Sequence, residues 1–426
     1  MGRGRVLVAM SGGVDSSVVA NLLVEQGYDC LGATMRLASN EDDRPGERTC
    51  CSTDDVADAR QACWDAGIRH YTFDYTNQFS REVIDPFVAG YEVGLTPNPC
   101  VACNRHLKFG ALLDRALELG CDHLATGHYA RVTQDDRGYH LLKGVDAAKD
   151  QSYFLFGLTQ QRLAHVMFPL GGLHKASEVR DLAERMGLSS AHKKDSEGIC
   201  FVPGGDHLRF IEERTGRAAR PGDVLDTRGN VIGTHAGALR YTLGQRKGLG
   251  VACTHPVYVV GIDTTANTVT LGEQEQLLSS ELVAGDWNWV AGQVPAAPLR
   301  AAAKVRYHQP DQPCLVTPLA DGRVRVEFET PQRAITPGQA AVVYEGDECL
   351  GGGTILAQEV YAESDAPGPT GCQARHVRGI VRISGRKARN RSASSCSTCR
   401  GPSPGACRSP RGVSRPRARW RPRVTR

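Results

Sequence analysis

The sequence predicts an α/β protein in which a parallel sheet covered by helices precedes two small β-barrel-like domains and a basic tail. Three observations lead to this fold class. Strand-like and helical segments alternate up to about residue 200, short β-rich runs with Gly, Pro and Asn turns follow, and every acidic residue lies before residue 366. Alternation is typical of parallel sheets, and short runs with many turns are typical of antiparallel barrels. We therefore predict four parts, at 1–208, 209–278, 279–363 and 364–426.

The first part should contain a sheet whose strands all run in one direction. Its expected strands cover 6–10, 31–35, 70–73 and 123–126, and its expected helices cover 16–26, 53–66 and 107–119. A helix between two strands favours parallel pairing, with helices on both faces of the sheet. Ligands bind such sheets at the carboxyl ends of the strands. The candidate site is therefore expected where these strands end.

The second and third parts should be small antiparallel barrels. Their β-rich runs are short and separated by turn residues. The expected strands cover 229–231, 257–262, 268–271, 282–290, 301–307, 323–329, 341–344 and 349–355.

Charge divides the chain into two unlike regions. The 426 residues carry 51 Lys and Arg against 47 Asp and Glu, but 16 of the basic residues and no acidic ones lie in 366–426. Residues 1–365 consequently have a net charge of −12. The tail is rich in Arg, Pro, Ser and Gly, a composition that cannot build a core, so we expect it to be disordered. Two interpretations of it stay open: an RNA-binding arm, and the out-of-frame translation of a GC-rich gene end.

Apolar runs are too short for a membrane span, and the first residues do not resemble a secretory signal. We therefore expect a cytoplasmic protein without membrane partners. In that reducing compartment the 15 cysteines should be thiols, metal ligands or catalytic groups, because disulfide frameworks are rare there.

A glycine- and serine-rich loop follows the first expected strand. The string Ser-Gly-Gly-Val-Asp-Ser-Ser at 11–17 leads directly into a helix. Adjacent glycines let backbone N–H groups approach an anion, and the helix N-terminus adds donors and a positive dipole end. The string matches neither a Walker A loop nor a dinucleotide-binding fingerprint. It predicts a polyphosphate-binding loop of another kind.

Two cysteines are candidate nucleophiles. Cys103 lies in a proline-stiffened loop at 96–104 and precedes a helix expected from Leu107, with Lys108 one turn in. Cys200 also has lysines nearby in the sequence. A helix N-terminus and cationic neighbours lower the pKa of a thiol. Each cysteine taken singly also fits a small buried hydrophobic residue.

The loop at 11–17 resembles the PP-loop of the N-type ATP pyrophosphatases, which adenylate a carbonyl oxygen. Together with the two cysteines, it resembles the tRNA-specific 2-thiouridylases over nearly all of 5–360. The further matching segments are Thr-Pro-Asn-Pro-Cys-Val-Ala-Cys-Asn to Lys at 96–108, Ala-Thr-Gly-His-Tyr-Ala-Arg at 125–131, Lys-Asp-Gln-Ser-Tyr-Phe-Leu at 149–155, Lys-Asp-Ser-Glu-Gly-Ile-Cys at 194–200, Thr-Leu-Gly-Gln-Arg-Lys-Gly-Leu-Gly at 242–250 and Pro-Gly-Gln at 337–339.

The resemblance implies ATP-dependent 2-thiolation of wobble uridine 34 in tRNAs for Lys, Glu and Gln, by a tRNA-uridine 2-sulfurtransferase that releases AMP and pyrophosphate. It implies Cys103 as the nucleophile and Cys200 as the persulfide carrier, with a transient disulfide between them and no stable metal. A cysteine desulfurase or a sulfur-carrier protein would donate the sulfur. ATP, with Mg²⁺, would be bound by Ala9, Met10, Ser11, Gly12, Gly13, Val14, Asp15, Ser16, Met35 and Gly127.

The resemblance also implies a set of tRNA contacts. Some family members have Asp where this chain has Cys100, an acid proposed to assist proton transfer, so that role is unfilled here. The implied tRNA-binding residues are Asn98, Pro99, Cys100, His128, Lys149, Asp150, Gln151, Arg306, Tyr307 and Gln339. Arg240, Arg246 and Lys247 would add basic groups for phosphate contacts.

Three alternatives remain open. A PP-loop ligase could pass nitrogen to an adenylated carbonyl, although Cys103 and Cys200 would then have no role. A non-catalytic RNA-binding module could descend from such an ATPase. Cys50 and Cys51 could instead join Cys100 and Cys103 in a zinc or iron–sulfur site, because Cys-x-x-Cys is half of a common metal framework.

Overall fold

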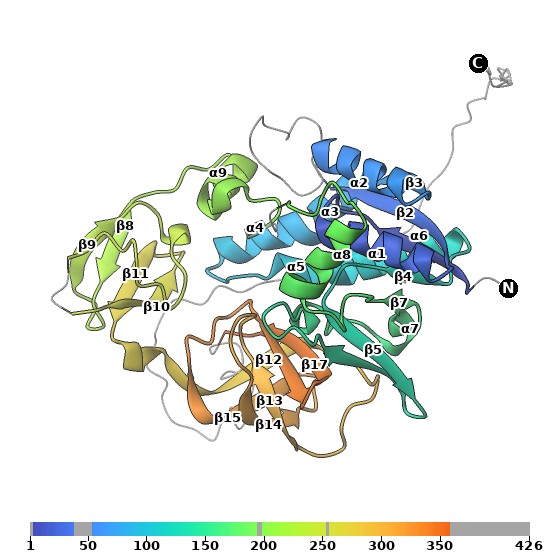
Figure 1. Ribbon diagram of the computed structural model, residues 1–426. Coiled ribbons are helices and arrows are strands. Elements are labelled where there is room, and N and C mark those ends of the chain that lie inside the picture. The colour runs from blue at the N-terminus through green and yellow to red at the C-terminus, as the bar shows by residue number, and fades with distance from the viewer. Residues whose placement is uncertain (1–2, 38–52, 194–197, 253–254, 358–426) are drawn as a thin grey trace, which may run out of the picture. The chain divides into compact units, whose positions relative to one another are not determined.

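The computed structural model describes residues 3–37, 53–193, 198–252 and 255–357. Its first sheet is parallel throughout, as predicted, with the strand order β3-β2-β1-β4-β7. Figure 1 shows this sheet with helices on its two sides. The short edge strand β7 was not expected. The five strands are β1 (Arg5–Ala9), β2 (Asp29–Arg36), β3 (Arg69–Asp74), β4 (His123–Ala125) and β7 (Val166–Met167).

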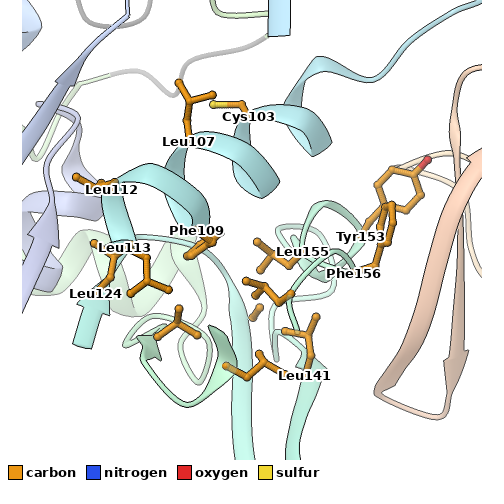
Figure 2. Packing of buried hydrophobic residues seen from close by; sticks show 14 of the residues in the cluster. Cys103, Leu107, Phe109, Leu112, Leu113, Leu124, Leu141, Tyr153, Leu155 and Phe156 are labelled. Atoms are coloured by element: carbon orange, nitrogen blue, oxygen red, sulfur yellow. The ribbon is translucent and has the colours of Figure 1, made fainter. Parts of the chain in front are cut away.

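Helices cover both faces of this sheet because neighbouring side chains of β1 point to opposite sides. Val6 and Val8 pack with α1 (Val14–Glu25), α2 (Thr53–Asp65) and α8 (Arg180–Arg185). Leu7 belongs to a second group of buried residues, here called the central cluster, which includes Leu7, Met35, Cys103, Leu107, Phe109, Leu112, Leu113, Leu124, Leu141, Tyr153, Leu155, Phe156, Val342, Tyr344 and Cys349. Figure 2 shows part of this cluster.

The other helical segments are short. Those before the central helix are α3 (Thr76–Phe79), η1 (Ser80–Ile84) and α4 (Asp85–Glu92). The central helix itself consists of α5 (Pro99–Ala102), the π-helical η2 (Cys103–Leu112) and α6 (Leu113–Glu118). Later come η3 (Ser152–Phe154), α7 (Gln160–Leu163), η4 (Lys175–Val179), η5 (Pro203–Gly205), α9 (His207–Thr215), η6 (Ala238–Arg240) and η7 (Gln274–Leu277).

The middle domain has one pairing that differs from the prediction. Its four-stranded sheet has the order β10-β11-β8-β9, and β11 runs parallel to β8 rather than antiparallel. The long connection after β9, which contains η6, brings the second hairpin alongside the first in this direction. The strands are β8 (Gly222–Leu225), β9 (Val231–His235), β10 (Tyr258–Asp263) and β11 (Thr268–Gly272).

The last domain is a closed antiparallel barrel, as predicted. Six strands follow the order β12-β15-β14-β13-β16-β17, and β17 pairs with β12 to close the ring. The strands are β12 (Leu278–Trp289), β13 (Leu299–Lys304), β14 (Gln312–Pro318), β15 (Val324–Arg333), β16 (Ala340–Glu345) and β17 (Glu348–Ile355). Arg306 and Tyr307 were predicted to lie at the end of a strand. This prediction is wrong, because β13 ends at Lys304 and both residues lie in the turn that follows.

A hairpin from the first domain extends the barrel sheet. The sequence did not predict its strands, β5 (Ala130–Asp135) and β6 (Gly138–Lys143), and β6 pairs with β17 through Leu142 and Glu348. Barrel residues Val342, Tyr344 and Cys349 are members of the central cluster. The barrel and the parallel-sheet domain therefore share one apolar core.

Within the described ranges, no helix is long and apolar enough to cross a membrane. Cys50, Cys51 and residues 358–426, which contain the whole of the expected tail at 364–426, lie outside those ranges. The domain boundaries at 208, 278 and 363 stay predictions.

Candidate active site

The phosphate loop connects β1 to α1. Gly13 is the N-cap of α1 in an extended conformation, and no side chain in the described ranges caps the helix. The hydroxyl groups of Ser16 and Ser17 each donate to the Gly13 carbonyl at 3.0 Å, which folds the loop onto the first helical turn. The first amides of α1 therefore combine with the positive end of the helix dipole to suit a phosphate group.

Two glycines let other segments approach this loop closely. Gly12 has a φ of +73°, and a Cβ on it would lie 2.4 Å from the backbone oxygen of Asp55 at the start of α2. Gly127 follows β4, and a Cβ there would lie 2.9 Å from the Asp15 Cβ and 3.3 Å from the Ser16 nitrogen. Side chains at either position would push the loop away from its neighbours.

Asp15 is the one charged residue of the loop, and it has two partners from distant parts of the chain. The Tyr129 hydroxyl donates to its Oδ1 at 2.8 Å, and the Lys175 ammonium donates to its Oδ2 at 2.8 Å. Lys175 is buried. The ion pair offsets the negative charge of Asp15, which would otherwise repel a phosphate.

The ten residues expected at ATP gather at the carboxyl edge of the sheet, because β2 and β4 flank β1 in parallel register. Met35 lies near the end of β2, and Gly127 lies just after β4. Met10 and Val14 are buried in the core beneath the loop. Only their main chains are placed to face a ligand there, whereas their side chains support the loop from behind.

Cys103 lies inside a helix and not in the loop that was predicted. The central helix begins at Pro99, where the Asn98 side chain accepts a hydrogen bond from the Val101 nitrogen at 3.4 Å. Asn is a favoured N-cap residue and Pro is favoured in the first helical position. Those two residues were a readable signal for the earlier start. Cys103 begins the second turn, so the helix N-terminus acts more strongly on Cys100 than on Cys103.

Cys103 is buried in the central cluster, beside Leu107 on the same helix (Figure 2). Cys200, which is half-buried, and Phe201 pack against the same cluster. The Phe201 ring anchors its segment, with ring centroids 5.5 Å from Phe79 and 5.2 Å from Phe87. One candidate cysteine is thus a member of the central cluster, and the other packs against it.

Asp150 and Gln151, expected at tRNA, are engaged within the protein. Asp150 is buried, and its carboxylate accepts hydrogen bonds from the nitrogens of Gly144 and Ser152, each at 3.1 Å. It also pairs with Lys304 of the barrel at 3.5 Å. The Gln151 Oε1 accepts from the Tyr129 nitrogen at 3.0 Å. Lys149, next to them, is half-buried.

Arg306 and Gln339 of the barrel hold neighbouring segments. The Arg306 guanidinium donates to the Ala334 carbonyl at 3.0 Å and to the Leu243 carbonyl of the middle domain at 3.4 Å. Burial lowers the pKa of Arg306. The Gln339 amide donates to the Thr96 carbonyl at 2.8 Å, just before the central helix. Both side chains therefore position other segments around the site.

His128 is fully enclosed beside Lys108. Its Nδ1 lies 2.7 Å from the Thr126 hydroxyl, and its Nε2 lies 3.5 Å from the Lys108 ammonium. Burial, and then the charge of Lys108, hold the pKa of His128 well below its ordinary value of 6.5. A neutral imidazole carries no charge to attract a phosphate. Its contact with Lys108 instead joins it to the central helix.

Tyr307 lies in an aromatic group, with its ring centroid 4.4 Å from those of Phe154 and His308. Burial raises the pKa of Tyr307 to about 12. A neutral aromatic ring of this kind can stack on an unpaired base.

Sequence reasoning missed several residues that the fold brings to the phosphate loop. Lys175 lies outside every motif, and Lys193 was noted only as a neighbour of Cys200. The Lys193 ammonium lies 3.2 Å from the Gly12 carbonyl, 2.8 Å from Asp55 and 2.9 Å from Asp58. All four residues come from segments that only the folded chain joins to the loop.

The metal-site alternative involves Cys50 and Cys51, which lie outside the described ranges. Within those ranges, no group of three or more His, Cys, Asp or Glu side chains is placed to hold a metal ion.

Family comparisons agree with this architecture. Residues 4–204 match the tRNA methyl transferase HUP domain, 209–273 match the tRNA methyl transferase PRC-barrel domain, and 279–355 match the aminomethyltransferase beta-barrel domain. The fold and the phosphate loop thus define a HUP-domain protein with two appended β domains.

Relatives of nearly full length narrow this class. The tRNA-specific 2-thiouridylase MnmA of Symbiobacterium thermophilum is 52% identical over 360 residues, which cover 82% of this chain and 92% of the relative. The MnmA of Geobacter metallireducens is 51% identical, with 83% and 97% covered. A solved 4-thiouridine synthetase–RNA complex with bound ATP overlaps half of each chain at 17% identity and a TM-score of 0.31. The chain belongs to the tRNA-specific 2-thiouridylase family.

Proposed function

We propose that the protein is a tRNA-uridine 2-sulfurtransferase, which replaces the C2 oxygen of wobble uridine 34 by sulfur in tRNAs for Lys, Glu and Gln. One observation carries this proposal beyond the family relationship. The central cluster includes Met35 and Cys103, and Ala9 and Cys200 pack against it, so it connects the expected ATP edge with both candidate cysteines. A nucleotide at that edge and a sulfur relay between those cysteines would therefore share one site.

ATP, accompanied by Mg²⁺, would supply an adenylyl group that converts the C2 oxygen into part of a good leaving group. The chain provides the setting for this step. Amides at the start of α1 would hold the phosphates, and Gly12 and Gly127 would let the loop close around them. Met35 would border the nucleotide from β2.

The two cysteines would then transfer sulfur in a balanced sequence. Cys200 accepts a sulfane sulfur from a cysteine desulfurase or a sulfur-carrier protein and becomes a persulfide. The terminal sulfur of this persulfide bonds to C2 while AMP leaves. The Cys103 thiolate bonds to the inner sulfur as the persulfide S–S bond breaks. Formation of the Cys103–Cys200 disulfide supplies the two electrons that the transferred sulfur gains, and an external dithiol must then reduce the disulfide.

The start of the central helix would meet the target base through Asn98, Pro99 and Cys100. Lys149 and Tyr307 would contact the surrounding RNA, whose unpaired bases are open to stacking. Asp150, His128, Arg306 and Gln339 would act mainly by holding these segments in place. No carboxylic acid stands at position 100, so the thiol of Cys100 would face the base instead.

The proposal is tested by thiolation of cognate tRNA with ATP and a sulfur donor. Cys103→Ser and Cys200→Ser should each abolish 2-thiouridine, measured by mass spectrometry of the wobble nucleoside. Both variants should still form AMP when tRNA is added, because adenylation needs neither thiol. Cys314→Ala is a matched control, since burial raises the pKa of this barrel thiol to about 12 and leaves it inert.

Thiolation by either serine variant at the wild-type rate would contradict the relay. If the wild-type protein formed AMP at the same rate with and without tRNA, tRNA would not be the substrate that is adenylated. Stoichiometric zinc or iron in anaerobically purified protein would favour the metal-site alternative.

A further inference from the structure

The phosphate loop contains no basic residue of its own. A Walker A loop carries a lysine that reaches the phosphates, whereas the loop at 11–17 carries one charge, the carboxylate of Asp15. A polyphosphate held by backbone amides alone would leave several negative charges poorly compensated. Basic side chains from elsewhere in the chain would compensate these charges together with the Mg²⁺ that accompanies ATP.

Among the residues that the structure describes, two lysines reach the loop, and they are placed differently. Lys175 forms an ion pair with Asp15, and its side chain is 9% exposed. The Lys193 ammonium lies 3.2 Å from the Gly12 carbonyl, and its side chain is 26% exposed. Lys193 therefore borders both the loop and solvent, where an incoming phosphate would arrive.

The backbone at Lys193 is well anchored. The Lys193 nitrogen donates to the Ser190 carbonyl at 2.9 Å, and the Arg180 guanidinium donates to the Lys193 carbonyl at 3.3 Å. The same guanidinium donates to the Ala191 carbonyl at 2.6 Å. With its main chain fixed in this way, the long side chain can change partners without moving the surrounding fold.

The carboxylates of Asp55 and Asp58 hold the ammonium beside the loop. Their oxygens lie 2.8 and 2.9 Å from its Nζ. Burial acts to lower the pKa of Lys193, but hydrogen bonds to Asp55 and Asp58 outweigh it and raise that pKa. The group is thus kept protonated at the loop. An ammonium has three donors that rotate together, so a phosphate oxygen can replace a carboxylate without loss of charge pairing.

We propose that Lys193 is a ligand of the ATP polyphosphate, whose ammonium exchanges one carboxylate of the Asp55–Asp58 pair for a phosphate oxygen when ATP binds. This inference rests on the proposed function, because it assumes that the loop binds ATP. It adds a binding residue that lies 181 positions after Gly12 in the sequence. The lysine would serve the reaction by holding the phosphates, and it would not touch the uridine.

The experiment is calorimetric binding of α,β-methylene-ATP and of AMP to the full chain. Lys193→Gln should weaken binding of the ATP analogue by about 10- to 100-fold, as expected for loss of one charge-assisted hydrogen bond. AMP binding should change by less than about threefold, because most of the polyphosphate is missing. Lys193→Arg should restore much of the affinity for the ATP analogue.

Two further variants separate this role from a purely structural one. Asp58→Asn replaces a competing carboxylate by a neutral amide and should leave the affinity for the ATP analogue unchanged or higher. Arg81→Gln removes one positive charge from an arginine whose side chain is 70% exposed, and it should have no effect. Thermal unfolding of each variant checks that the chain is folded.

Equal weakening of AMP and the ATP analogue by Lys193→Gln would overturn the inference, as would weakening by Asp58→Asn to the same degree. Either result would mean that the lysine only ties α2 to the loop. Unchanged analogue binding by Lys193→Gln would also overturn it, while leaving the proposed function intact. A wild-type protein that binds no ATP analogue would instead reject the proposed function, and the inference with it.

Discussion

Gly127 illustrates how one residue without a side chain can determine the shape of a nucleotide site. It follows β4 and lies against Asp15 and Ser16 of the phosphate loop. Asp15 cannot move away easily, because Tyr129 and Lys175 both hold its carboxylate at 2.8 Å. The loop and the strand end are therefore matched to within the size of a methyl group.

Gly127→Ala should consequently weaken ATP binding. Its new Cβ would lie 2.9 Å from the Asp15 Cβ, and overpacking of this kind typically costs about 1–3 kcal/mol. We expect the affinity for an ATP analogue, measured by calorimetry, to fall by roughly tenfold or more.

Gly172→Ala is the matched control, because an added Cβ there has no heavy atom of the described residues within 4 Å. It should bind the analogue as the wild type does. Wild-type affinity in Gly127→Ala would mean that the loop does not need this close approach.

At the residue scale, sequence motifs predicted functional residues that lie close together in the chain. They did not predict residues that only folding brings to the site. The loop at 11–17 could be predicted directly, because its two glycines and three serines are typical of an anion-binding loop. Lys175 carries no such local signal. Asp150 and Gln339 were expected at RNA, yet their contacts with Lys304 and Thr96 lie within the protein. A sequence string does not reveal whether a polar residue points outward or across a domain boundary.

At the scale of elements, the hairpin of β5 and β6 links the parallel-sheet domain to the barrel. His140 on β6 has its Nδ1 2.6 Å from Glu348 of β17 and its Nε2 2.8 Å from Asp135 of β5. Hydrogen bonds to Glu348, and then to Asp135, raise the pKa of His140 above its ordinary value of 6.5. The protonated ring can donate to both carboxylates, whereas the neutral ring can donate to only one.

This arrangement predicts a stability contribution that depends on pH. Because the pKa of His140 is raised in the folded state, the contribution is fully present below 6.5 and is lost as pH rises through the folded pKa. His140→Gln should therefore lower the unfolding temperature more at about pH 6 than at about pH 9.

His192→Gln serves as the comparison, since that side chain is 88% exposed and should show little pH dependence. An equal effect of His140→Gln at both pH values would indicate that the ring acts through packing alone.

Elements with strong periodicity were predictable, and those defined by pairing across the chain were not. The alternating strands and helices of the first domain gave a correct fold class. The start of the central helix was placed eight residues late, because the two prolines around Asn98 were taken as loop-forming. The hairpin of β5 and β6 went unrecognised. Its attachment to the barrel could not be predicted either, since Leu142 of β6 and its partner Glu348 lie more than 200 residues apart.

At the scale of the whole molecule, most of the chain is acidic, whereas an RNA-binding protein is expected to be basic. Residues 1–365 carry a net charge of −12, and 16 basic residues lie in 366–426. Bulk attraction would place RNA binding in the tail. The proposed site instead lies in the acidic part, where a local group of basic and aromatic residues must oppose the average charge.

Removal of 367–426 should accordingly leave tRNA binding and thiolation within about twofold of the full chain, with a similar dependence of affinity on salt. Filter binding at several salt concentrations measures both quantities. Arg246→Gln is the contrasting variant, because loss of one phosphate contact should reduce the salt slope by about one.

A large loss of tRNA affinity on truncation, together with a shallower salt dependence, would show that the tail is an RNA-binding arm. It would also exclude the interpretation of the tail as an out-of-frame extension without function.

The contacts between the barrel and the start of the central helix set an order for folding during synthesis. All strands of the parallel sheet have been made once Met167 is added, so that sheet can assemble early. Thr96 must wait for Pro337 and Gln339, which bond to it at 3.0 and 2.8 Å. Glu348 and the closing strand β17 come later still. We therefore expect the nascent chain to acquire a nucleotide pocket well before its base-binding segment is fixed, so a ribosome-bound intermediate would bind ATP before it could bind tRNA.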